Sequence, residues 1–145
     1  MAQESVSDDV DWVAAQSKCT AMQMFDRLKA RVDEDVRRRN GVSSRNDGWA
    51  FELEEDGDDF EVLRLRSGAG ESKVLAAVRF ERSGRRIAVH GEDVDVDFTA
   101  IVTLDGTGLC RFVVGEALYP EWEISRMALE ALFFGQNVRT AFAVG

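Results

Sequence analysis

The chain has 145 residues, a length typical of one domain. Of these residues 45% are hydrophobic and 31% are charged, which is the composition of a globular protein rather than a disordered one. The formal net charge of −9 argues against binding to nucleic acid or to an anionic membrane surface, because an acidic chain is repelled by both. The sequence contains no signal-peptide pattern and no run of about eighteen apolar residues, so we expect a cytoplasmic protein that does not span a membrane.

The first predicted element is a helix that begins near residues 7–8 and ends at Asn40. Its apolar residues recur every three or four positions, which places them on one side of a helix: Met22, Phe25, Leu28, Val32 and Val36. Acidic residues at its start and arginines at its end suit the helix dipole. Trp12 and Cys19 lie off this stripe, so we expect the helix either to break near residue 16 or to pack its first half differently.

Six strands are predicted next, separated by short turns rich in Gly and Asp. They cover residues 49–54, 60–66, 73–82, 86–90, 94–104 and 109–115. The clearest runs from Val94 to Leu104, where every residue of one parity is apolar. In the second strand Val62 and Leu63 are adjacent, and a β-bulge would resolve the parity. Because the connections are short, consecutive strands should pair as antiparallel neighbours.

Pro120 and Gly135 mark the expected limits of a second helix. Glu123, Arg126 and Glu130 form one narrow polar stripe on it, and most other positions are apolar. A helix this apolar needs cover on more than one side. We therefore predict an α+β fold, in which an N-terminal and a C-terminal helix pack on one face of a curved, six-stranded antiparallel meander sheet.

We predict a single α+β domain over residues 1–145, with residues 1–7 and 140–145 frayed. The tail, residues 136–145, is half apolar and could add a short strand or pack against the sheet. Cys19 and Cys110 match no metal or redox spacing, so we interpret both as buried thiols and leave their pairing open.

Few residues could carry catalysis. His90 is the only histidine, which excludes any site with two His ligands, and a Ser–His–acid triad would have to use it with Glu92 as the orienting acid. The sequence has no Gly-x-Ser-x-Gly motif, and we interpret His90 as a surface residue at a strand end. We predict no catalytic residues and expect a protein that is not an enzyme.

The acidic residues near the fifth strand could in principle bind a hard cation: Glu92, Asp93, Asp95 and Asp97. Alternating acids on an exposed strand are common, however, and they also protect sheet edges. The sequence lacks the ordered ligand spacing of a calcium loop. We predict no metal site and no cofactor.

The predicted outer face of the sheet is only half polar, since Leu75 and Ile101 lie there beside Arg79 and Arg111. Exposed apolar groups of this kind often mark an interface, unless the tail or the first half of the N-terminal helix covers them. The apolar C-terminal helix gives the same indication independently. The candidate interface or pocket residues are Trp49, Leu75, Arg79, Ile101, Arg111, Trp122, Leu129 and Phe133.

We therefore expect a non-catalytic protein-interaction module that self-associates as a homodimer, through an apolar sheet face or the C-terminal helix, or that binds another protein. The alternative is a binder of a small apolar anion, with Trp49, Trp122, Arg79 and Arg111 around a pocket between the curved sheet and the helices.

Two resemblances bear on these alternatives. A small acidic α+β domain loosely resembles the secretion chaperones that hold a segment of an effector protein, which implies partner binding. Those chaperones carry a helix in the middle of the strand series, whereas here Ser83-Gly84 alone joins the third and fourth strands. The strand meander flanked by helices is also similar to helix-grip ligand-binding domains, although those begin with an additional strand and end in a longer helix.

Overall fold

The computed structural model describes residues 10–42, 48–68 and 71–135, so the ends predicted to fray and the tail lie outside the described residues. The helices are α2 (Trp12–Lys18), α3 (Ala21–Asn40) and α4 (Glu121–Phe134). The strands are β1 (Trp49–Asp56), β2 (Asp59–Gly68), β3 (Glu71–Ser83), β4 (Arg86–Glu92), β5 (Asp97–Leu104), β6 (Cys110–Val114) and β7 (Ala117–Tyr119).

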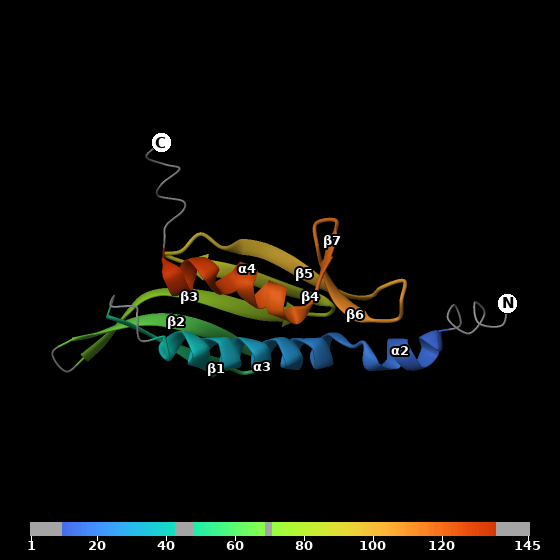
Figure 1. Ribbon diagram of the computed structural model, residues 1–145, viewed down its shortest axis with the longest axis horizontal. Helices are drawn as coiled ribbons and strands as arrows, with labels where there is room; N and C mark the ends of the chain where they lie inside the picture. The colour runs from blue at the N-terminus through green and yellow to red at the C-terminus, as the bar shows by residue number, and fades with distance from the viewer. Residues whose placement is uncertain (1–9, 43–47, 69–70, 136–145) are drawn as a thin grey trace.

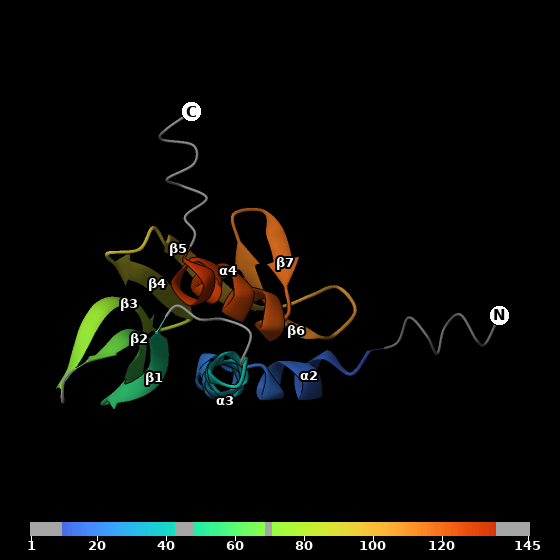
Figure 2. The same ribbon diagram turned by 60° about the vertical axis from the view of Figure 1, so that its left-hand side comes forward.

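The seven strands form one antiparallel sheet in sequence order, and the sheet is not closed. Figures 1 and 2 show α3 and α4 on the same face of this twisted sheet, while α2 extends away from it. The predicted α+β meander with helices on one face is therefore confirmed, with one strand more than expected. The additional strand β7 is only three residues long, and it turns back on β6 through Gly115, whose φ is +64°. So short a strand has no periodic pattern of its own.

The N-terminal helical segment is divided into two helices, which was one of the two alternatives expected; the helix is interrupted at Cys19 and Thr20 rather than near residue 16. The Thr20 hydroxyl accepts a hydrogen bond from the backbone N–H of Gln23 and caps α3. The Cys19 and Cys110 sulfurs form a disulfide that joins this break to β6. In α3 Met24 is buried instead of Met22, which is exposed; the other residues of the predicted stripe are in the core.

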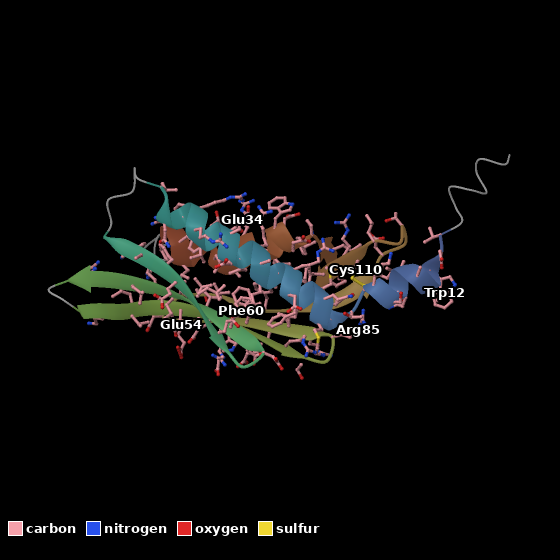
Figure 3. The ribbon with its side chains drawn as sticks, turned by 90° about the horizontal axis from the view of Figure 1, so that it is seen from below. Trp12, Glu34, Glu54, Phe60, Arg85 and Cys110 are labelled. Atoms are coloured by element: carbon pink, nitrogen blue, oxygen red, sulfur yellow. A yellow bond between two sulfur atoms is a disulfide. The ribbon has the colours of Figure 1, made fainter. Side chains whose placement is uncertain are left out.

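The core lies between the sheet and the two long helices, where Figure 3 labels Phe60. The Phe60 ring stacks on Phe80 with 4.5 Å between centroids and meets Phe25 of α3 at 5.2 Å. These three side chains are essentially inaccessible to solvent. Alternate residues of β3 and β4 complete the core beside them, as the strand periodicity predicts.

β5 is shorter than predicted. It starts at Asp97, because the preceding residues form a turn in which Asp93 has a φ of +62° and the Gly91 N–H donates to the Val96 carbonyl. A Cβ on Gly91 would lie 2.4 Å from the Val94 carbonyl oxygen, so this close approach requires glycine. Val94 and Val96 still pack against the core from the turn.

The bulge lies elsewhere than predicted. Val62 faces the core and Leu63 the outer face in regular alternation, and the register shift falls between β2 and β3, where Leu75 has no partner opposite it. Beyond the bulge Val74 pairs with Leu65 of the outer face, so its side chain is 54% exposed instead of buried. No helix in the described ranges is both long and apolar enough to cross a membrane.

Each edge of the sheet has a feature that limits pairing with a further strand. Beside β1, the Asn40 side-chain amide donates to the Phe51 carbonyl oxygen and accepts from the Phe51 N–H, both at 2.9 Å. One side chain thus satisfies the backbone groups that a further strand would use at Phe51. The opposite edge, β7, is only three residues long and is followed by Pro120, which has no N–H to donate.

Candidate functional site

The apolar surface of α4 is covered from two directions within the chain. Ile124, Ala128 and Leu132 follow one another at i, i+4 spacing and are inaccessible, on a helix that packs against β3 and β6. Leu129 and Phe133 belong to the neighbouring stripe and are buried toward α3. Most of the apolar character that suggested an external interface is therefore core.

A polar contact fixes α4 beside α3. The buried Ser125 hydroxyl donates to the Asp35 carboxylate of α3 at 2.8 Å. The same carboxylate accepts from Arg31 at 3.3 Å and from Arg38 at 3.4 Å. Near the start of α4, Glu121 accepts from Arg27 at 3.0 Å. The two helices therefore run side by side in the same direction, as Figure 1 also shows.

Arginines from other elements stabilise the C-terminal end of α4, whose own last turn carries no basic residue. The Arg39 guanidinium is buried, donates to the Phe133 carbonyl at 2.8 Å and lies 4.8 Å from the centroid of the Phe51 ring. Arg64 of β2 donates to the Leu132 carbonyl at 3.1 Å. Positive charge at this position is favoured by the helix dipole and by the carbonyls that lack helical partners.

A groove of about 290 Å³ opens between the C-terminal halves of α3 and α4. Leu129 and Phe133 form its apolar floor, and charged side chains from both helices surround it. Its lining residues are Asp35, Arg38, Arg39, Val42, Ser125, Arg126, Leu129, Glu130, Phe133 and Phe134. This volume lies just below the range of about 300–1,000 Å³ that is usual for small-molecule pockets.

One stripe of α4 faces solvent beside this groove: Trp122, Arg126, Glu130 and Phe134. The two aromatic side chains at its ends are 45% and 43% exposed. Between them Arg126 and Glu130 form an ion pair at 3.5 Å, with side chains 64% and 60% exposed. We call these four residues the α4 stripe. It combines exposed aromatic surface with one charge of each sign.

The opposite, outer face of the sheet is divided by a row of four charged side chains and His90 that crosses five strands. The strand register aligns Glu54, Glu61, Arg79, His90 and Asp97. Ile101, Val113 and Leu118 lie to one side of this row, and Leu63, Leu65 and Val74 lie to the other. The apolar residues of this face are therefore two separate groups.

Arg79 is the centre of this row. Its guanidinium contacts Asp56 at 2.6 Å and Glu81 at 2.8 Å. The hydrogen bond with Glu81 is the main cause that raises the pKa of Arg79, and the same bond holds the pKa of Glu81 below its usual value. Glu54 stands directly opposite Glu61, and its pKa is raised by desolvation and by the nearby carboxylate of Glu52.

His90 lies on this open face, half exposed, with Nε2 3.3 Å from a Glu81 carboxylate oxygen. It faces solvent on the side of the sheet opposite the helices and the groove. Among the described residues, no three His, Cys, Asp or Glu side chains converge as metal ligands.

The eight candidate residues do not form one site. Four of them are on the outer face of the sheet: Leu75, Arg79, Ile101 and Arg111. The Arg111 Nε lies 3.4 Å from a carboxylate oxygen of Asp105. Leu129 and Phe133 are in the floor of the groove, and Trp122 is exposed on the same helix. Trp49 packs at the end of α4, where the Arg64 guanidinium lies 4.1 Å from the centroid of its ring.

Sequence reasoning named only Leu129 and Phe133 among the ten residues that line the groove, and it missed the other eight, including Arg38, Arg39, Val42 and Phe134. The helix dipole is a sufficient reason for arginines at the C-terminal end of α3. Nothing in the sequence places that end of α3 beside residues 125–134. The available signal was the missing basic residue in the last turn of α4, which indicates that charge must come from another element.

Neither protein-family models nor curated proteins nor solved structures give a match to this chain.

Proposed function

We propose that this protein is a non-catalytic interaction module that self-associates through its helical layer. The observation that carries the proposal is the α4 stripe, where two large aromatic side chains remain exposed on a helix whose other apolar residues are buried or partly buried. Aromatic residues with an arginine are the composition enriched in the centres of protein interfaces. Three of the four residues, Arg126, Glu130 and Phe134, also line the adjacent groove.

The outer face of the sheet is the weaker candidate, because the charged row through Arg79 separates its apolar groups. Burying that row would desolvate Glu54, Glu61 and Asp97 as well as the arginine. Desolvating charges without new partners is costly, so apolar contact on both sides of the row gains little. The helical layer requires no such burial.

Capture of a partner segment as an added strand, which the resemblance to secretion chaperones suggests, has little room. The Asn40 amide occupies the Phe51 backbone groups at one edge, and β7 with Pro120 offers only a short second edge. Strand addition depends on free backbone groups along an edge. Face-to-face contact of helices has no such requirement.

A second candidate function is binding of a small apolar anion in the groove. Its lining includes three arginines, Arg38, Arg39 and Arg126, which outnumber the two acidic residues Asp35 and Glu130. This site differs from the one expected from sequence, since it lies between two helices rather than between sheet and helices. Thermal-shift titration with medium-chain carboxylates tests it: a saturable rise in melting temperature that is lost in Arg126→Ala supports binding, and no shift at millimolar ligand removes it.

Solution mass tests the main proposal. Light scattering across a range of protein concentrations should show the wild type moving from the monomer mass of 16.2 kDa toward twice that mass. The variant Trp122→Ala/Phe134→Ala should remain monomeric under conditions where the wild type is dimeric.

The matched control is Ile101→Thr, which removes an exposed apolar group from the outer sheet face. It should associate like the wild type. A wild type that stays monomeric at every concentration would overturn the proposal, and so would dissociation caused by Ile101→Thr but not by the α4 variant.

A further inference from the structure

The α4 stripe has an internal symmetry. Its aromatic residues Trp122 and Phe134 lie six positions on either side of Ala128, and its charged residues Arg126 and Glu130 lie two positions on either side. Successive members are at i, i+4 spacing, so the four form one exposed row that winds gradually around the helix. When such a row meets a copy of itself in the opposite direction, each residue faces the residue at the same distance on the other side of the centre.

We propose that the partner in self-association is a second copy whose α4 packs antiparallel on this one, with a two-fold axis level with Ala128. This inference rests on the proposed function and specifies its register. Each Trp122 then faces Phe134 of the second copy, and each Arg126 faces Glu130 of the second copy. A two-fold interface requires this self-complementarity, since each contact occurs twice.

Charge favours this orientation over a parallel one. In parallel pairing Arg126 would face another Arg126 and Glu130 another Glu130, which places like charges together. In antiparallel pairing opposite charges meet twice. The intrachain pair at 3.5 Å is exposed enough for both side chains to reach a second helix as well.

The groove lies next to the proposed aromatic contact. It opens beside Phe134, the residue that the partner's Trp122 would contact. Its volume is about 290 Å³, just below the usual range for small-molecule pockets. Arg38 at the rim belongs to α3 and adds a cation near the incoming indole, a favourable arrangement for an aromatic ring.

Charge-reversal variants mixed in pairs test the register. Arg126→Glu and Glu130→Arg should each weaken self-association by roughly tenfold or more, because each places two like-charged pairs across the axis. An equimolar mixture should recover dimers, since both contacts between the two different chains are again attractive. The doubly reversed chain, R126E/E130R, should match the wild type in dimer mass.

The mixture separates this effect from a folding defect. Both single variants lose the same exposed intrachain pair, so recovery on mixing can arise only between chains. A dimeric wild type whose single variants associate normally, or whose mixture fails to recover, would overturn the antiparallel register while leaving self-association intact. A wild type that is monomeric at every concentration would overturn self-association itself.

Discussion

Removing the disulfide between Cys19 and Cys110 should produce a large loss of stability. The two residues are 91 positions apart, so the bond closes most of the described chain into one loop. The chain-entropy relation gives about 4.6 kcal/mol for a loop of this length at 25 °C. That is a large part of the free energy of unfolding of a typical domain, which is roughly 5–15 kcal/mol. Cys19→Ala/Cys110→Ala should therefore unfold at much lower denaturant.

The assay is urea unfolding of the wild type and the double alanine variant at one protein concentration, with and without a thiol reductant. The reductant should lower the wild-type midpoint toward that of the variant and leave the variant unchanged. A difference in free energy of unfolding below about 1 kcal/mol would refute the reasoning, because the loop constraint would then be absent. Helix α2 has no buried residue of its own, so its helicity should fall first.

Three further changes test local features. Gly135→Ala should destabilise by about 2 kcal/mol or more in urea unfolding, since the residue has a φ of +66° and a Cβ would lie 2.4 Å from the Trp49 ring. Asn40→Ala should cost about 1 kcal/mol and increase aggregation, because it frees the Phe51 edge groups. Hydrogen bonds in the β5–β6 turn lower the pKa of the Asp105 carboxyl to about 2. An NMR pH titration should therefore find it well below the usual value of about 3.9.

The changes at Gly135 and Asn40 each have a matched control. Gly57→Ala has a similar φ of +64° but open space around it, so it should cost less than the change at Gly135. Asn40→Asp can still accept from Phe51 but cannot donate to it, so its stability should fall between wild type and alanine. Equal effects within either pair would contradict the contacts assigned here.

The sign of the acid effect at Asp105 follows from its lowered pKa. The folded form binds its proton less readily than the unfolded chain, so the carboxylate stabilises the fold above about pH 4 and this contribution is lost as the pH falls toward about 2. Asp105→Asn should therefore lose less stability than the wild type across that interval. An Asp105 that titrates near 3.9 would contradict the hydrogen bonds from Thr107 and Leu109.

The fold could be predicted from the sequence where the alternation of apolar residues along a strand was the only determinant. Alternation in β4 and β5 predicts which residues face the core, and Ile87, Val89, Ala100 and Val102 are all inaccessible or nearly so. Prediction was wrong where tertiary contacts decide. A bulge at Leu75 turns Val74 outward, which the regular alternation of that strand does not reveal.

The candidate site was harder to predict from the sequence, because tertiary contacts decide which of its residues are exposed. The sequence of α4 shows that most of its surface is apolar, but it does not show whether α3 or another molecule covers Leu129 and Phe133. Only the packing of the two helices separates these buried residues from Trp122 and Phe134, which stay exposed. Residues that meet across about ninety positions, such as Asp35 and Ser125, leave no local pattern.

Intermolecular contact between Trp122 and Phe134 is the most direct test of self-association through α4. The two residues are twelve positions apart on one helix, which is about 18 Å at 1.5 Å per residue and beyond the reach of a nuclear Overhauser effect within one chain. In a mixed sample of labelled and unlabelled protein, isotope-filtered spectra should show transfer between these rings. Transfer to Ile101 and Leu118 instead, with none between the two aromatic rings, would contradict the account.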